Sequence, residues 1–268
     1  MSVKHRWGSD VGTKTAAQSI YEASTTQLHR IGTRLKLGER TFYYGLAAAG
    51  CSPGEICSSD QSLLGSANGL LPDASCCALT AATQRSDQPA ITAALAVGDT
   101  WLAVTHADML DNVTQNMLKD GYVILTDSGG VDQIKKIKWN GAMASDIVAI
   151  ELYDEIDVAT TDSTTGVTLM MNPFMELRPA DNAVDENPAG VPLVEIAADS
   201  YGWFQTWGPC MLQTADDTAF GGANLELDDT AGLCTIIDSG GVEARLGFGV
   251  TDVTASGDAA MVILQIYP

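Results

Sequence analysis

Short β-prone runs separated by glycine-containing turns limit most strongly what this chain can fold into. The clearest runs are Trp101–Thr105, Gly121–Thr126 and Val131–Trp139, and the last of these follows the turn signal Ser128-Gly129-Gly130. Runs of this length that are rich in Val, Ile, Thr and aromatic residues are typical of strands. Close spacing of such runs is typical of antiparallel sheets. The pattern predicts a mostly β protein, with antiparallel barrel or sandwich units and an extended N-terminal arm.

The pattern divides the 268 residues into three parts. Residues 1–45 are expected to form an extended basic arm that ends in a hairpin, residues 46–177 a β domain, and residues 191–268 a second β unit. The segment Arg178–Gly190 between the last two combines two prolines with three acids and is the best candidate for a linker. The final apolar run, Ala260–Ile266, is expected to be a buried strand that closes the fold.

Charge is distributed unevenly along the chain. The net charge is −20, but residues 1–40 carry seven Lys and Arg against three acids, about +4, which leaves about −24 for the rest. Residues from Ser2 to about Arg30 lack hydrophobic periodicity, so we expect them to be extended or to become ordered on a partner. A docking arm and a solvated tail are both compatible with this asymmetry. As a docking arm it would bind its partner through Lys4, Arg6, Lys14, Arg30, Arg34, Lys36 and Arg40.

Composition argues against two kinds of partner. A nucleic-acid-binding body needs clustered Lys and Arg to contact phosphates, and this chain has 34 acidic residues against 14 basic ones. No run approaches the ~20 apolar residues of a membrane helix. Residues Met1–Asp10 do not resemble a secretory signal, because no apolar segment follows them. We therefore expect a soluble protein that is made in the cytoplasm and binds neither nucleic acid nor membrane.

The sequence offers no catalytic residue, no metal ligand set and no cofactor motif that we can name. The histidines are His5, His29 and His106, and no GxSxG, HExxH or P-loop sequence accompanies them. The six cysteines form no CxxC pair, which argues against zinc, and most of the thiols are expected to be reduced. The Asp-rich turns leave calcium binding open. These observations favour a protein that is not an enzyme.

The most distinctive segment is Tyr201–Cys210 (YGWFQTWGPC). In a strand Trp203 and Trp207 would lie on the same face, together with Tyr201 and Gln205. Three interpretations remain open for this aromatic row: core packing, a subunit contact in which tryptophan is favoured, and a carbohydrate-binding platform.

Several segments resemble, in pattern and order, a group of head structural proteins of environmental tailed bacteriophages. The segment that contributes most is Thr26–Phe42 (TQLHRIGTRLKLGERTF), where the basic arm runs into the predicted hairpin. Further similarity lies in Asp120–Val123 leading into Ile134–Trp139, in Leu152–Asp154 followed by Met171–Phe174, and in Tyr201–Cys210. The similar segments extend from about residue 25 to residue 210.

The resemblance implies a capsid decoration or cement protein on the virion surface. Such a protein binds the outside of the head shell and stabilises it, with the major capsid protein and other copies of itself, as a homotrimer, for partners. The basic N-terminal segment would contact the shell, and Trp203 and Trp207 are candidate subunit contacts. The alternatives are a tail, spike or major shell component, and, from a different class, a carbohydrate-binding module that uses Trp203 and Trp207.

Overall fold

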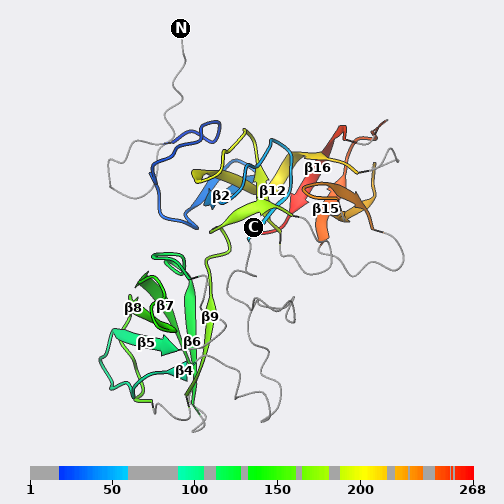
Figure 1. The fold of residues 1–268 in the computed structure, drawn as a ribbon. Coiled ribbons are helices and arrows are strands. Elements are labelled where there is room, and N and C mark those ends of the chain that lie inside the picture. The colour runs from blue at the N-terminus through cyan, green and yellow to red at the C-terminus, as the bar shows by residue number, and fades with distance from the viewer. Residues whose placement is uncertain are drawn as a thin grey trace.

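The structure is a computed structural model that describes residues 18–59, 90–105, 113–127, 132–160, 165–180, 188–215, 221–228, 230–237, 245–253, 255 and 257–268. All regular secondary structure in these residues is β-strand, in sixteen strands (Figure 1). The prediction of a mostly β fold is therefore confirmed. None of the described segments is a helix that could cross a membrane.

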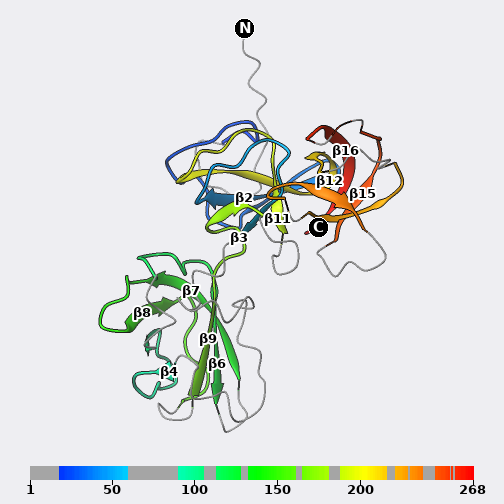
Figure 2. The same ribbon diagram turned by 45° about the vertical axis from the view of Figure 1, so that its right-hand side comes forward.

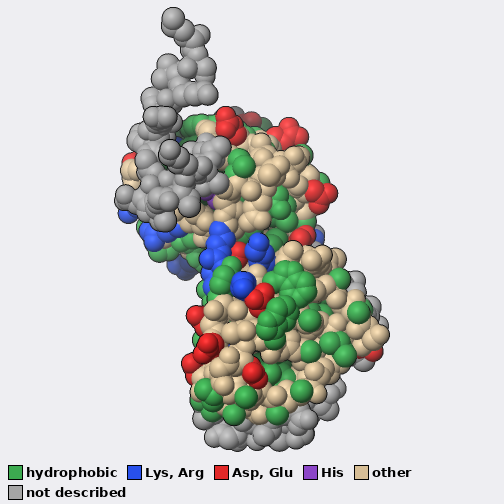
Figure 3. All heavy atoms as spheres, turned by 90° about the vertical axis from the view of Figure 1, so that its left-hand side faces the viewer, with side chains coloured by type: hydrophobic (Ala, Val, Ile, Leu, Met, Phe, Trp, Pro, Cys, Tyr) green, Lys and Arg blue, Asp and Glu red, His purple; other side chains and the backbone are tan. Residues whose placement is uncertain are grey.

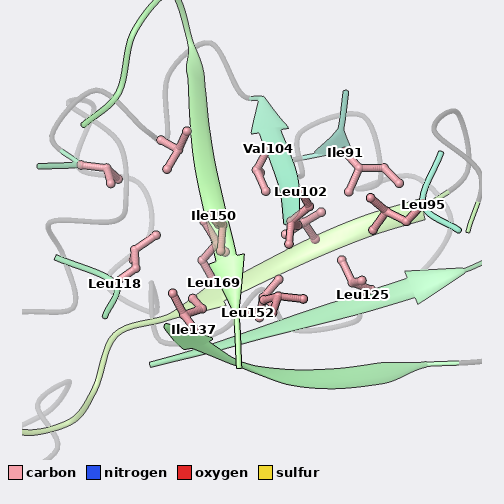
Figure 4. Packing of buried hydrophobic residues seen from close by; sticks show 14 of the residues in the cluster. Ile91, Leu95, Leu102, Val104, Leu118, Leu125, Ile137, Ile150, Leu152 and Leu169 are labelled. Atoms are coloured by element: carbon pink, nitrogen blue, oxygen red, sulfur yellow. The ribbon is translucent and has the colours of Figure 1, made fainter. Parts of the chain in front are cut away.

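A closed six-stranded antiparallel barrel is formed within residues 90–170. Its strands are β4 (Ala90–Ile91), β5 (Trp101–Thr105), β6 (Tyr122–Asp127), β7 (Gln133–Asn140), β8 (Ile147–Leu152) and β9 (Thr165–Met170). They pair in the order β4-β5-β8-β7-β6-β9, and β9 closes the barrel on β4. Strand β8 shows how the core is filled: Val148, Ile150 and Leu152 are buried, whereas Ile147 and Ala149 point outward. Figure 4 shows the aliphatic side chains of these strands meeting between them.

The remaining strands form a ten-stranded sheet whose first half closes on itself. Its strands, in spatial order, begin with β1 (Arg34–Leu37), β2 (Arg40–Ala47), β10 (Leu177–Pro179), β3 (Cys57–Ser59), β11 (Pro188–Pro192) and β12 (Ser200–Gln213). Because β12 also pairs with β2, the strands from β2 to β12 make a closed ring. Phe42, Phe174, Leu177 and Phe204 belong to the hydrophobic cluster of this part.

The long strand β12 continues into a second ring. Its C-terminal half pairs with β16 (Ala259–Gln265), and β15 (Arg245–Gly249), β13 (Asn224–Leu227) and β14 (Cys234–Ile236) follow (Figure 2). A bridge between Thr214 and Cys234 brings β14 back to the end of β12. This ring has its own hydrophobic cluster, which includes Leu212, Leu225 and Leu264. The final apolar run predicted as a strand is β16, and it pairs with β15.

Strand β12 is uninterrupted where the sequence pattern predicts two strands, Gly202–Trp207 and Cys210–Thr214. Its pairing with β16 runs continuously from Trp207 to Gln213. Gly208 lies between the two predicted strands, at φ 88°, and a Cβ there would be 2.5 Å from the carbonyl oxygen of Glu39. Gly208 therefore does not end the strand. It allows the strand to pass close to the β1–β2 turn, where a side chain would not fit.

Strand pairing crosses the segment boundaries predicted at residues 45 and 177. β2 and β3 come from the first 60 residues and complete the first ring with β10, β11 and β12, so the barrel of residues 90–170 is inserted between β3 and β10. The ends of the predicted linker, β10 and β11, both pair with β3. Residues 181–187 of that linker lie outside the described residues. The pairing joins segments over 150 residues apart, as when Trp203 pairs with Tyr44, and local patterns carry no information about it.

The described part of the predicted arm lies along its own chain. Ser24 forms a bridge with Tyr201, in which each backbone nitrogen donates to the other residue's carbonyl oxygen at 3.0 and 2.7 Å. Oε1 of the Gln18 side chain accepts a hydrogen bond from the Tyr44 hydroxyl at 2.7 Å, and the backbone carbonyl oxygen of Gln18 accepts one from Trp203 Nε1 at 3.2 Å. Residues 18–29 therefore contact the chain's own β2–β12 pair.

Candidate interaction surfaces

The exposed strand β1 carries two of the predicted binding residues. Arg34 and Lys36 are exposed, whereas Leu35 and Leu37 between them are half-buried and pack against the core. β1 is the end strand of the ten-stranded sheet. Arg40, opposite Leu37 in the hairpin, lies with its guanidinium carbon 5.2 Å from the centre of the Phe42 ring. Charges on an end strand discourage strand pairing with other chains, and they are also available to an acidic partner.

Arg30 is separated from this hairpin and lies where the barrel meets the sheet. Its Nε is 2.6 Å from Asp120 Oδ1, and its guanidinium carbon is 4.3 Å from the centre of the Tyr153 ring. The Asp120 side chain is 1% exposed, and it also accepts a hydrogen bond from the Tyr153 hydroxyl at 3.2 Å. Figure 3 shows Lys and Arg side chains gathered across this junction. Arg30 therefore acts within the chain, where it compensates a buried carboxylate.

Asn172 completes the junction. Its Nδ2 donates to the carbonyl oxygens of Ile31, at 3.4 Å, and Asp120, at 3.2 Å, while its Oδ1 accepts from the backbone nitrogen of Phe174 at 3.0 Å. One buried amide thus holds the N-terminal segment, the barrel and the chain that leaves the barrel. Lys4, Arg6 and Lys14 of the predicted arm lie outside the described residues.

The two tryptophans of the predicted aromatic row have different surroundings. Trp203 is 4% exposed and packs against Tyr44 and His29, with ring centres 5.2 and 5.1 Å away. Trp207 is half-buried on the side of the sheet that carries Met211 and Met261. The interpretation of core packing therefore describes Trp203, and only Trp207 is accessible to another molecule.

His29 and the four described cysteines have buried side-chain atoms. Burial lowers the pKa of His29, whose Nε2 is buried without a hydrogen-bond partner among the described residues. Cys51, Cys57, Cys210 and Cys234 are free and buried, and burial raises the pKa of both the Cys210 and the Cys234 thiols to about 12. Within the described part of the chain no three His, Cys, Asp or Glu side chains are grouped so that they could hold a metal ion. His5 and His106 lie outside that part.

Sequence reasoning missed an aromatic pair on the outside of the barrel. Trp101 is 53% exposed, and its ring centre is 5.7 Å from that of the partly exposed Trp139. Both residues stand in predicted strands, but their contact depends on pairing with β8, which single runs do not reveal.

Comparison with known proteins identifies no significant match. No protein-family model matches the chain, and neither a curated protein nor a solved structure is significantly similar to it. Its function must therefore be inferred from its own residues and their arrangement.

Proposed function

We propose that the chain is a virion structural protein, a capsid decoration or cement protein that binds the outer surface of a tailed-bacteriophage head shell and stabilises it. The observation that carries this proposal is the basic end strand of an acidic chain. Arg40, the partner of Leu37, lies on the other face of the hairpin, whereas Arg34 and Lys36 are exposed on β1, and within the described residues neither of these two forms an ion pair. They are free to bind an acidic protein surface.

The proposed role suits a chain of this charge and architecture. Outside residues 1–40 the chain carries about −24 charges, which would keep the exposed side of a bound copy solvated and apart from other particles. Individual contacts need only modest affinity, because many copies act together on a lattice.

Copies of the chain would contact one another through the outer face of β12 and β16, as a homotrimer. The outward residues of these paired strand segments include Trp207, Met211, Met261 and Ile263, and none of the outward positions is charged. Met211 and Met261 are directly opposite each other and are 47% and 53% exposed. On a molecule with a net charge of −20, an uncharged apolar face is where like molecules can approach without repulsion.

Cosedimentation tests the shell contact. The probe is a shell assembled from the major shell protein encoded in the same phage genome. Replacement Arg34→Glu should weaken binding about fivefold to tenfold, because a charge at the rim of an interface is reversed, and raised salt should weaken binding of the unaltered chain. The matched control is Arg245→Glu, an equal charge change on the exposed start of β15, which should leave binding within about twofold. Equal loss in both variants, or no binding by the unaltered chain, would rule out the basic end strand as the contact.

Sedimentation equilibrium tests the self-contact separately. The unaltered chain should have three times the mass of the 28.2 kDa monomer. Met261→Asp should give a folded monomer, because it places a charge in the contact. A monomeric unaltered chain would contradict the trimer and leave the shell contact to be judged on its own test.

A further inference from the structure

Two tryptophans and a glutamate lie side by side on the outer face of the barrel. In the pairing of β8 with its two neighbours, Glu151 stands opposite Trp101 of β5 on one side and Trp139 of β7 on the other. The three side chains therefore form one row across three strands. The two indole rings are 5.7 Å apart and inclined at 56° to each other. Neither ring belongs to the hydrophobic cluster inside the barrel.

Local backbone features place Trp139 on the outside. The pairing of β7 with β8 shifts register between Ile137 and Trp139, so that Ile137 is buried and Trp139 is partly exposed. Gly141 then leaves room for the ring, because a Cβ at that position would lie 3.2 Å from Trp139 Cη2. A strand bulge of this kind redirects a side chain, and such bulges are enriched near functional sites.

An ion pair and two short side chains lie beside the aromatic rings. Lys138 Nζ donates to Glu151 Oε1 at 2.6 Å, and the two side chains are 49% and 22% exposed. The next outward residue along β8 is Ala149, and its partner across β5 is Ala103, so the side chains beside the tryptophans are short. Figure 3 shows hydrophobic side chains on the barrel surface beside charged ones. A flat ligand can therefore lie against the rings and reach the carboxylate and the ammonium group.

We propose that Trp101, Trp139, Glu151 and Lys138 form a binding site for a neutral glycan. One face of a pyranose ring presents C–H groups with partial positive charge, and the faces of indole rings are negative, so the two surfaces attract each other while apolar area is buried. The hydroxyl groups at the rim of the sugar donate to a carboxylate and accept from an ammonium group in charge-assisted hydrogen bonds. The inclined rings suit consecutive sugar residues of a twisted chain.

Charge indicates which glycans fit. Glu151 and Lys138 neutralise each other, and the chain as a whole carries −20, so sulfated, sialylated or uronic-acid polymers are repelled. A protein partner is less suited, because the centre of a protein interface is enclosed by apolar residues and depleted in charge, whereas this row includes a solvated ion pair. The proposal is independent of shell binding and does not require it.

Affinity electrophoresis and titration calorimetry test the proposal on the full chain, with cellohexaose, xylohexaose, mannohexaose and maltohexaose as probes. At least one should bind with a dissociation constant on the order of 0.1–1 mM, with a change in tryptophan fluorescence. Trp101→Ala and Trp139→Ala should each weaken that binding about tenfold. Tyr21→Ala, which removes a 59% exposed aromatic ring elsewhere, should not change it.

Thermal melting shows whether each variant remains folded, as expected for changes at exposed side chains. The proposal is overturned if none of the four hexasaccharides binds at about 10 mM. It is also overturned if folded Trp101→Ala and Trp139→Ala bind the sugar as tightly as the unaltered chain. If these variants also lose association with shells or with other copies, the aromatic pair is a protein contact instead.

Discussion

The Nε atom of Arg30 lies 2.6 Å from Oδ1 of Asp120, and this contact joins the N-terminal segment to the inserted barrel. The Asp120 side chain is almost completely buried, at 1% exposure, and its backbone has φ 63°. The Arg30 side chain is 48% exposed. The buried charge is thus compensated from the solvent side by a residue that the sequence places in a basic arm.

Replacement of Arg30 by alanine should reduce the free energy of unfolding by about 1.5–3 kcal/mol, because it leaves the carboxylate of Asp120 buried without a cation. Asp120→Asn should cost less: asparagine tolerates the left-handed backbone, and Arg30 can be hydrated. In the Arg30→Ala background, Asp120→Asn should restore part of the lost stability. Urea unfolding of the two single variants and the double variant measures this coupling. Additive losses would show that the two side chains do not interact.

Gly121→Ala should be among the most damaging small substitutions. A Cβ at Gly121 would lie 2.2 Å from the carbonyl oxygen of Met170 and 3.0 Å from that of Leu118, so backbone would have to move, at a cost of about 2–4 kcal/mol. The control is Gly50→Ala, where no atom lies within 4 Å and the change should stay within about 0.5 kcal/mol. Denaturation midpoints in urea compare the two. A similar midpoint for both variants would refute the close contact.

Stability should fall with acid through His29. Burial lowers its pKa below 6.5, so the fold favours the neutral imidazole. The neutral His29 therefore contributes to the free energy of unfolding above pH 6.5. This contribution is lost as the pH falls through the lowered pKa of the folded state, because the unfolded chain binds the proton more readily. His29→Phe keeps a ring beside Tyr44 and Trp203 and cannot titrate. Unfolding at pH 7.5 and pH 5.5 should show a smaller loss for this variant than for the unaltered chain, and equal losses would contradict the prediction.

The buried cysteines should be unreactive in the folded protein. With Cys76 and Cys77 replaced by serine, the remaining thiols are those of Cys51, Cys57, Cys210 and Cys234, all buried. A pKa of about 12 at Cys210 and Cys234 leaves about one thiol in ten thousand ionised at pH 8. Ellman's reagent at pH 8 should therefore react only after denaturant is added. Rapid reaction of the folded variant would contradict this burial.

The same raised values predict how stability depends on alkaline pH. The folded thiols of Cys210 and Cys234 hold their protons more tightly than the ordinary value of 9.0 implies. Their contribution to the free energy of unfolding is fully present below pH 9. It is lost as the pH rises toward 12, at about 1.4 kcal/mol per pH unit for each thiol. Cys210→Ala should reduce this slope in urea unfolding between pH 9 and pH 10.5. An unchanged slope would show that the Cys210 thiol does not titrate with a raised pKa.

Local patterns predict local structure well in this chain. Leu35 and Leu37 alternate with charges before the turn at Gly38, which predicts the hairpin of β1 and β2, and the strand predicted at Trp101–Thr105 coincides with β5. The pairing of β2 with β12 could not be predicted, because the two strands are separated by the whole barrel. That pairing decides which residues share a core.

The sequence pattern also does not distinguish surface aromatic residues from core aromatic residues. Alternation places Trp203 and Trp207 on one strand face, but it reveals neither the contacts of Gln18 and His29 with Trp203 nor the register shift between Gln205 and Trp207 in the pairing with β2. Trp101 and Trp139 become neighbours because β8 lies between their strands. In both cases exposure depends on a distant segment, which no window of the sequence contains.

Cryo-electron microscopy of virions tests the central claim most directly. Under the proposed function a phage genome encodes the chain, and virions of that phage are imaged with the gene intact and with it deleted. The account predicts regularly repeated density on the outer surface of the head, at local threefold positions, that disappears with the gene. Heads that look the same in both samples, or density lost only from the tail, would contradict a decoration protein.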